Sequence, residues 1–395
     1  MVRRGRELIQ LPGPTNIPER VLRAMHRSAT DFAAPEFTRL ARGCLDDLRR
    51  VFQTAGEVYA YVALGHGTWE VALENLVARG GRVLIPETGR FSESWKEMAQ
   101  ALGAEVVETR PYWREPLDPA EIEAILRADR PHSIAAVMMV QVETSTGILH
   151  DVAAVRRAVE AAGHPALLVV DAVASLACVD LPMDAWGVDV VLTASQKGLM
   201  LPPGLAFVAV GERARRRAAA QGAPRQYWDW RIRHGEESYL WFYGTPPIPM
   251  IHGLRESLDM LFEEGLPNVF ARHRRLAEAA RRAVLHWSEG GAFEPQCTVP
   301  EARSDVVTAL RFADGYDPDA LRMHCRDRLS VAFGGGIGRF RGRLLRIGHL
   351  GDLNEPMILG ALATLETGMR QLGIPHRPGG VGAAIAELAR DEGGA

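Results

Sequence analysis

Short apolar runs alternate with amphipathic stretches over the first two thirds of the chain. Seven of the runs have the length of strands, at residues 57–64, 82–87, 104–109, 133–142, 166–173, 188–195 and 204–211. Several are apolar on both faces, as strands are when helices cover each side of a sheet. The stretches between them, such as 68–80 and 151–163, have helical periodicity and end in glycine, a common helix C-terminal signal. This alternation predicts an α/β fold with a mostly parallel, doubly wound sheet of seven strands.

The pattern changes near residue 255, where longer helices replace the regular alternation. Residues 268–289 predict one long helix, and residues 354–373 predict another. Between them lie two less regular strands, at 305–313 and 343–350. We therefore expect a second, smaller α+β domain. The chain then divides into an N-terminal arm (1–20), a large domain (21–260) and a small C-terminal domain (261–395).

The composition excludes several classes of protein. The 395 residues are 47% hydrophobic and 24% charged, with a formal net charge of −3, which argues against nucleic acid or an anionic membrane as a partner. The four cysteines are far apart and lack the spacing of metal ligands, so we expect no metal site and a reducing, cytoplasmic compartment. The first residues contain no apolar stretch of signal length, and no run of roughly twenty apolar residues predicts a membrane span.

Polar residues follow several of the predicted strands, at the edge where ligands bind in open parallel sheets. After the first strand comes GHGTWE (65–70), a turn of small residues that opens a helix. Gly65 and Gly67 allow the backbone to approach a ligand closely, and the first helical amides with the Thr68 hydroxyl suit a phosphate group. Taken alone, the motif also fits an ordinary capped turn.

An acid and a lysine stand at two further strand ends. Asp171 follows four apolar residues, where a carboxylate is unfavourable unless it is paired. It is either a helix cap or ion-pair partner, or the partner of a protonated ring nitrogen. Lys197 follows the run 188–195. Its side chain either reaches solvent, as most lysines do, or lies in a dry pocket near other cations, where a lowered pKa makes the amine a nucleophile for carbonyl groups.

The three features together match the parts of pyridoxal 5'-phosphate. This cofactor has a phosphate, a pyridine nitrogen and an aldehyde, and the chain offers a phosphate-binding turn, an acid and an amine on different strand ends of one sheet. Lys197 would form the Schiff base with the aldehyde. Asp171 would keep the pyridine nitrogen protonated, so that the ring accepts electrons from the substrate α-carbon. We therefore predict pyridoxal 5'-phosphate as the cofactor.

Several ordered motifs resemble those of the class V, fold-type I aminotransferases, from residue 11 to about residue 373. They are LPGPTNIPERVLRAM, ETSTGI, VDAVASL, SQKGLMLPPGLA, GLRESLDMLFEEGLPNVFARH and RIGHLGDLNE. Within that family the chain is most similar to the serine–, alanine– and aspartate–glyoxylate aminotransferases. The resemblance implies ping-pong transfer of an amino group from one of these small amino acids to glyoxylate or pyruvate. It also implies a homodimer with an active site shared across the interface, or a tetramer built from two such dimers.

The resemblance assigns roles to the cofactor-binding positions. Lys197 matches the lysine that holds the cofactor and carries the proton between the substrate α-carbon and the cofactor. Asp171 matches the acid that faces the pyridine nitrogen. Phe91 matches the aromatic ring that stacks on the pyridine face, although an aromatic residue there also fits the core. The remaining cofactor contacts are expected at His66, Gly67, Thr68, Thr144 and Gln196.

Two further segments match the substrate site and the subunit interface. Arg346 matches the arginine that holds the substrate α-carboxylate through a guanidinium fork, with a surface or interface ion pair as the alternative. Gly13 matches backbone that lines the pocket. Relatives often read Tyr-Thr-Pro in a loop that reaches the neighbouring subunit's phosphate, where this chain reads YGTPP. Thr245 fits that role, and either Tyr243 or Phe242 fills the aromatic place.

The sequence leaves three other classes open. A cysteine desulfurase-like lyase needs a thiol on a mobile loop, and Cys325 lies instead in a helical stretch. A nicotinamide-dependent dehydrogenase needs G-x-G-x-x-G, and GHGTWEVA lacks the third glycine. A non-catalytic relative that only binds the cofactor would not need Lys197, Asp171 and Arg346 together.

The glycine-rich stretch 333–343 predicts a flexible loop before the strand of Arg346. It carries three arginines, Arg339, Arg341 and Arg343. They form either a solvated basic edge or a second cationic group that favours a dicarboxylate donor such as aspartate.

Overall fold

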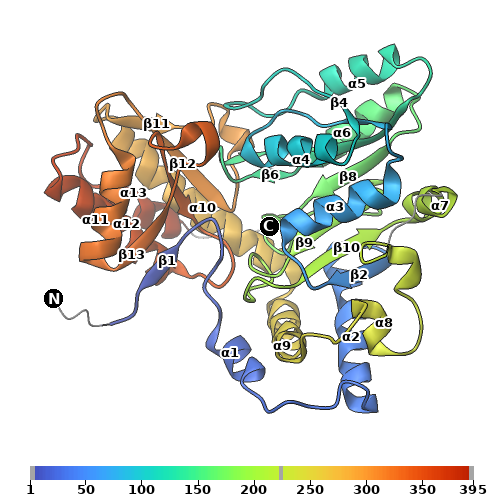
Figure 1. Cartoon of the computed structure of the whole chain (residues 1–395). Coiled ribbons are helices and arrows are strands. Elements are labelled where there is room, and N and C mark those ends of the chain that lie inside the picture. Colours follow the sequence, from blue (N-terminus) through green and yellow to red (C-terminus); the bar gives the residue numbers. More distant parts are fainter. Residues whose placement is uncertain (1–4, 222–225, 391–395) are drawn as a thin grey trace.

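The computed structural model describes residues 5–221 and 226–390, and within them the larger sheet has seven strands (Figure 1). Its spatial order is β2 (Glu57–Tyr61), β10 (Ala206–Val210), β9 (Val190–Ala194), β8 (Leu167–Asp171), β5 (Ile134–Val140), β3 (Arg82–Leu84) and β4 (Glu105–Val107). Strands β9, β8, β5, β3 and β4 pair in parallel, whereas β10 is antiparallel to both of its neighbours. The predicted α/β fold with a mostly parallel seven-stranded sheet is confirmed.

Helices cover both faces of this sheet, which explains why its strand runs are apolar on both sides. Every residue of β5, β8, β9 and β10 is buried. One face packs against α2 (Pro35–Phe52), α5 (Pro119–Ala128), α6 (Val152–Ala161) and α9 (Ile248–Glu264). The other face packs against α3 (Gly65–Leu76), α4 (Arg90–Ala101) and α7 (Glu212–Ala220). Alternate side chains of each strand, such as Val169 and Val170 of β8, point into the two cores.

A second sheet, with five strands in the described part of the chain, lies beside the large one (Figure 1). Its order is β1 (Leu8–Gln10), β13 (Val331–Gly335), β14 (Leu344–Gly348), β12 (Val307–Phe312) and β11 (Phe293–Pro295). Its apolar core also contains side chains of α10 (Leu266–Ser288), α11 (Pro318–Leu329), α12 (Glu355–Gln371) and α13 (Gly380–Leu388). Strand β1 lies within the predicted N-terminal arm and pairs in parallel with β13. The domain boundaries themselves stay predictions.

The remaining elements are short. Helix α1 (Glu19–Met25) lies against α9, and α8 (Ser238–Phe242) lies against β2 and α2. Strands β6 (Val142–Glu143) and β7 (Ile148–Leu149) pair with each other. Single 3₁₀ turns occur at η1 (Trp230–Ile232), η2 (Pro300–Ala302) and η3 (Gly338–Phe340). Among the described residues, no helix combines the length and the apolar character that crossing a membrane requires.

The glycine-rich stretch 333–343 is more ordered than the sequence predicts. Its first three residues belong to β13, where Gly334 and Gly335 pair with Arg346 and Leu345 of β14. Position 334 excludes larger residues, because a Cβ atom there would lie 2.7 Å from the ring of Pro12 in the segment after β1. The later part leaves the sheet through η3. The flexible-loop prediction was therefore wrong for the beginning of this stretch.

Candidate active site

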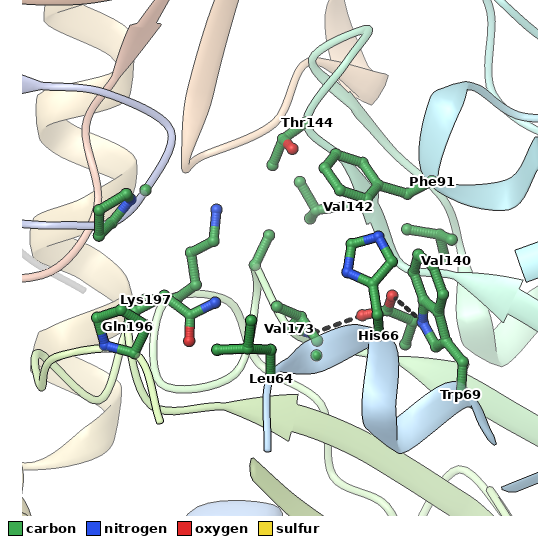
Figure 2. A pocket seen from close by; sticks show the side chains of 16 residues that line it. Leu64, His66, Trp69, Phe91, Val140, Val142, Thr144, Val173, Gln196 and Lys197 are labelled. Atoms are coloured by element: carbon green, nitrogen blue, oxygen red, sulfur yellow. Dashed lines mark hydrogen bonds between the residues drawn. The ribbon is translucent and has the colours of Figure 1, made fainter. Parts of the chain in front are cut away.

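A cavity of about 290 Å³ opens at the carboxyl edge of the large sheet (Figure 2). Its walls come from residues at or just after the ends of β2, β5, β8 and β9, and from the segment after β1. This is the edge at which parallel sheets bind ligands. The residues that line the cavity are Gly13, Pro14, Leu64, Gly65, His66, Trp69, Phe91, Val140, Val142, Thr144, Asp171, Val173, Ala174, Gln196, Lys197 and Pro203.

Lys197 projects into this cavity from the turn that follows β9 (Figure 2). The side chain is partly buried, and its amine donates a hydrogen bond to the carbonyl of Pro12. Burial, followed by the nearby positive charge of Arg346, lowers the pKa of the amine to about 8. A lysine side chain extended into bulk solvent, the alternative that the sequence left open, does not fit this geometry. Near neutral pH, a useful fraction of the Lys197 amine is therefore unprotonated and nucleophilic.

Asp171 is the last residue of β8, and its carboxylate borders the same cavity. Its Oδ1 accepts a hydrogen bond from the backbone N–H of Val173, and its Oδ2 accepts one from Nε1–H of Trp69, each at 2.7 Å. Burial raises the pKa of Asp171 to about 6, although both hydrogen bonds and the charge of Lys197 act in the opposite direction. Among the described residues, no arginine, lysine or histidine forms an ion pair with Asp171. The carboxylate is therefore held by neutral donors and can face a cation in the cavity.

Aromatic rings form one wall of the cavity. The ring centroid of Phe91 lies 6.4 Å from those of Trp69 and His66, and His66 lies 4.4 Å from Trp69. Figure 2 shows Phe91 and His66 facing the open space opposite Lys197. The wall is flat and apolar, which suits stacking against an aromatic ligand. Trp69 stands inside the GHGTWE motif, but a tryptophan at this helical position also fits the core, so its contact with Asp171 could not be predicted from the sequence.

A buried acid fixes the helix that carries Phe91. Glu143 accepts hydrogen bonds from the backbone N–H groups of Phe91 and Ser92, at 3.1 and 3.4 Å, and so caps the N-terminus of α4. The Ser145 backbone N–H and hydroxyl both donate to the other Glu143 oxygen, at 3.0 and 2.6 Å. Burial raises the pKa of Glu143 to about 7. This role of Glu143 is not predicted from the sequence, because in the ETSTG motif only Thr144 matches an expected cofactor contact.

The predicted phosphate turn lies at the start of α3, beside the cavity. Gly65 and His66 line the cavity, but Gly67 and Thr68 do not. The buried Thr68 hydroxyl donates to the carbonyl of Gly65 at 2.6 Å, so it closes the first turn of the helix. Thr144 and Gln196 line the cavity, as the predicted cofactor contacts require. The N-terminal end of α3 thus borders the cavity and offers backbone donors and the positive end of a helix dipole to an anion.

Arg346 lies on β14 of the small sheet; it does not line the cavity itself but contacts Thr144, which does. Its Nε–H donates to the carbonyl of Gly335 at 2.8 Å, and Nη1–H donates to the carbonyl of Thr144 at 3.0 Å. The residue is 8% exposed, and burial lowers the pKa of its guanidinium to about 10. Within residues 5–221 and 226–390, no carboxylate lies within ion-pair distance of it. This buried cation is therefore available to a carboxylate ligand. The surface ion pair is absent among these residues, whereas an ion pair across a subunit interface stays a prediction.

The segment after β1 connects the small sheet to the Lys197 turn. Gly13 has a φ of +110°, and a Cβ atom there would collide with the Lys197 side chain, so the position requires glycine. The backbone N–H of Thr15 donates to the Gln196 carbonyl and its hydroxyl to the Lys197 carbonyl, each at 3.1 Å. On the other side, the Gln10 amide donates to the carbonyl of Gly348 at 2.6 Å. Residues 10–15 thus form a cover over the amine.

The loop expected to reach a neighbouring subunit lies away from the cavity of its own chain. Tyr243 and Thr245 are both exposed and do not line the cavity. The Tyr243 hydroxyl donates to the side-chain carbonyl of Gln226 at 2.8 Å. Phe242, by contrast, is 2% exposed because it ends α8 inside the core of the large sheet. The proposal that Phe242 fills the aromatic place of this loop was therefore wrong.

Arg339 and Cys325, which the sequence analysis considered for a dicarboxylate donor and for a desulfurase, both lie outside the cavity. The guanidinium of Arg339 contacts the carboxylates of Glu93 and Glu87, at 2.6 and 3.4 Å, and lies 3.6 Å from the ring centroid of Trp113. Arg339 is therefore not a free cation for a dicarboxylate, but Arg339, Arg341 and Arg343 are all exposed, so the solvated basic edge is confirmed. Cys325 lies in α11, as predicted, and burial in the second core raises the pKa of its thiol to about 12. Among the described residues, no cysteine lines the cavity.

The fold and the site together define an α/β transferase of fold type I, with a lysine and an acid at the carboxyl edge of its large sheet. Residues 11–333 match the family model described as aminotransferase class-V. The chain belongs to this family and is a transaminase, so the resemblance seen in its motifs is confirmed.

Curated and structurally characterised relatives agree with this assignment. The chain is 42% identical to serine–glyoxylate aminotransferase of Methylorubrum extorquens, over 98% of this chain and 97% of the relative. It is 40% identical to L-aspartate–glyoxylate aminotransferase of Paracoccus denitrificans, over 97% and 96% of the two chains. The crystal structure of ureidoglycine–glyoxylate aminotransferase from Bacillus subtilis superposes with a TM-score of 0.88 at 28% identity, and covers 98% of this chain and 99% of that one.

Proposed function

We propose that this enzyme uses pyridoxal 5'-phosphate to transfer an amino group from serine, alanine or aspartate to glyoxylate or pyruvate. The observation that carries the proposal is the placement of the Lys197 amine and the Asp171 carboxylate on one small cavity. The names of two relatives, a serine–glyoxylate and an L-aspartate–glyoxylate aminotransferase, support glyoxylate as the acceptor. The predicted location in the cytoplasm stays a prediction.

The residues around the cavity fit the proposed cofactor. The N-terminal end of α3 suits the phosphate, the flat ring of Phe91 suits the pyridine face, and the buried Asp171 suits a protonated ring nitrogen. Lys197 supplies the amine that the aldehyde needs. When bound, pyridoxal 5'-phosphate supplies a carbonyl carbon and a ring that accepts electrons from the substrate α-carbon.

Each side chain then has a separate task in the transfer. The Lys197 amine, whose pKa is about 8, first acts as a nucleophile and then moves a proton at the substrate α-carbon. The negative charge of Asp171 would stabilise a protonated nitrogen on the pyridine ring of the cofactor. Arg346 binds the substrate carboxylate with the part of its guanidinium that does not contact Gly335 and Thr144. The cover formed by residues 10–15 keeps water from the amine.

A panel of amino donors tests this proposal. The purified holoenzyme is assayed with serine, alanine, aspartate and, as a larger control, leucine, each with glyoxylate and with pyruvate. We expect at least one of the three small donors to turn over with glyoxylate, and leucine to react poorly because the cavity is small. Release of sulfide from cysteine without amino transfer would favour the lyase alternative instead, but the buried Cys325 argues against it.

The proposed assembly is a homodimer with active sites shared across the interface. Large apolar side chains are exposed near the loop of Tyr243 and Thr245, where a second subunit would cover them. They include Val62, Leu64, Tyr227, Tyr239 and Tyr243 itself, between 37% and 51% exposed. Tyr243 and Thr245 are exposed in the single chain, which supports a role toward the partner's phosphate rather than their own.

Mixing two inactive variants tests the shared site. Thr245→Glu places a carboxylate against the partner's phosphate, so we expect it to prevent cofactor binding although the residue is exposed in the single chain. Lys197→Ala lacks the amine. Unfolded together in equal amounts and refolded, the two variants should recover about one quarter of wild-type activity, because half of the symmetric dimers are mixed and each mixed dimer has one intact site. Wild-type activity of Thr245→Glu alone, or no recovery on mixing, would contradict the shared site.

A further inference from the structure

The structure ties one tryptophan to the acid of the active site. We propose that Trp69 is a positioning residue, whose indole N–H keeps the Asp171 carboxylate ionised and oriented toward the cavity. The inference rests on the proposed function, since it gives Asp171 a partner for the role proposed above.

The contact is specific in its chemistry. Nε1 of Trp69 lies 2.7 Å from Oδ2 of Asp171, while the backbone N–H of Val173 occupies Oδ1 at the same distance (Figure 2). An indole can only donate, so this group always favours a charged acceptor. Asp171 is 4% exposed and has no ion-pair partner among the described residues. Its charge therefore depends on two neutral donors and on whatever cation enters the cavity.

Packing fixes the direction of the indole. Trp69 is 1% exposed, and its ring stacks on that of Trp95 at 5.7 Å with an interplanar angle of 14°. Phe91 meets it edge to face at 6.4 Å and 68°. Because these rings leave the indole little freedom to rotate, the N–H stays aimed at Asp171 while other atoms of Trp69 line the cavity. One side chain thus serves both the aromatic wall and the acid.

Trp95 offers a matched control. It belongs to the same stack and is 0% exposed, but within the described chain its Nε1 has no hydrogen-bond partner. Replacement by phenylalanine removes the same indole N–H and the same ring atoms at both positions. The Trp69→Phe variant loses the bond to Asp171, whereas the Trp95→Phe variant loses only packing. Any difference between them reports on the hydrogen bond.

The titration of Asp171 is the first measurement, because it does not need the cofactor. The carboxyl carbons of aspartate are labelled with ¹³C, and the Asp171 signal is identified by its loss in Asp171→Asn. In Trp69→Phe we expect the protonation midpoint to rise by about one pH unit, a tenfold change in the equilibrium, because one of two donors to a buried charge is gone. In Trp95→Phe we expect no change in the midpoint, because a phenyl ring at position 95 still stacks on Trp69. Equal midpoints in both variants would overturn the proposal.

Kinetics and the spectrum of the loaded enzyme give the second measurement. We expect Trp69→Phe to lower kcat about tenfold or more with a smaller change in KM, and to shift the visible absorption band of the bound cofactor, since the acid acts on the ring and not on substrate binding. Trp95→Phe should stay within about twofold of wild type. An unchanged kcat in Trp69→Phe beside an inactive Asp171→Asn would reject the role of Trp69 and keep the proposed function.

If Trp69→Phe does not fold, 3-benzothienylalanine at position 69 replaces the N–H by sulfur and keeps the shape of the ring. The same rise in the Asp171 midpoint is expected, because only the donor has been removed. An unchanged midpoint in this variant would again overturn the proposal.

Discussion

Replacement of Lys197 by alanine is expected to abolish multiple turnover and the visible absorption band of the bound cofactor. The variant lacks the amine that is proposed to attach the cofactor and to move the α-proton, and proton transfer by a positioned group alone is typically worth about 10²–10⁴-fold in rate. The substitution removes a partly buried cation that forms no ion pair with a described carboxylate, so the fold should persist. Steady-state aminotransfer to glyoxylate and an absorption spectrum measure the two effects.

The lysine that binds the cofactor can be identified directly, because the chain contains only two lysines, Lys96 and Lys197. Lys96 pairs with Glu108 at 2.7 Å, and this hydrogen bond raises the pKa of its amine. Burial lowers the pKa of Lys197 to about 8, so its neutral fraction grows as the pH rises through that value. We expect borohydride reduction with pyridoxal 5'-phosphate to label Lys197 and to increase toward pH 8–9. A label on Lys96, or a coloured and active Lys197→Ala enzyme, would refute the assignment.

Asp171→Asn is expected to lower kcat by about 10²–10³-fold, the usual effect of removing one preorganised electrostatic group from an active site. Asparagine has nearly the same shape, and its oxygen can still accept the hydrogen bond from Trp69 or Val173. The charge opposite the ring nitrogen is lost, and with it the ability of the ring to accept electrons. Single-turnover and steady-state kinetics with the preferred donor measure the change.

Restoring the positive charge on the ring distinguishes an electronic cause of the lower kcat in Asp171→Asn from a loss of structure. A cofactor methylated on the ring nitrogen carries a permanent positive charge, so it should restore part of the activity of Asp171→Asn. Asp189→Asn is the matched control, because Asp189 is also buried but binds the Leu168 backbone and Arg213, away from the cavity. It should leave kcat within about twofold of wild type. The electronic role of Asp171 would be rejected if the methylated cofactor gave no recovery.

Much of the fold follows from local sequence pattern. The strands of the large sheet are apolar on both faces because helices cover both, so their runs stand out. Strand β1 could not be predicted in this way, since Leu8–Gln10 is short and gains its stability by pairing with β13, more than 300 residues away in sequence. The same holds for Gly334 and Gly335, whose place in a strand depends on the close approach of Pro12.

The residues of the site also differ in whether local sequence predicts them. Lys197 and Asp171 could be predicted because each interrupts an apolar run at a strand end. Trp69 and Glu143 could not, because a tryptophan on a helix and an acid after a strand have no local mark of their contacts with Asp171 and α4. Phe242 was misjudged for the opposite reason: the sequence places it next to an exposed loop, but the short helix α8 turns its ring into the core.

The pairing of β1 with the small sheet links the site for the substrate carboxylate to the segment that covers the Lys197 amine. The proposed carboxylate clamp, Arg346 on β14, and the strand that leads into Gly13 are linked through β13 in one continuous sheet. Residues 13–15 in turn rest on the backbone and side chain of Lys197. The position of Arg346 and the position of the cover over the amine therefore depend on the same strand. A substitution that shifts β13 should disturb both substrate-carboxylate binding and the shielding of the amine.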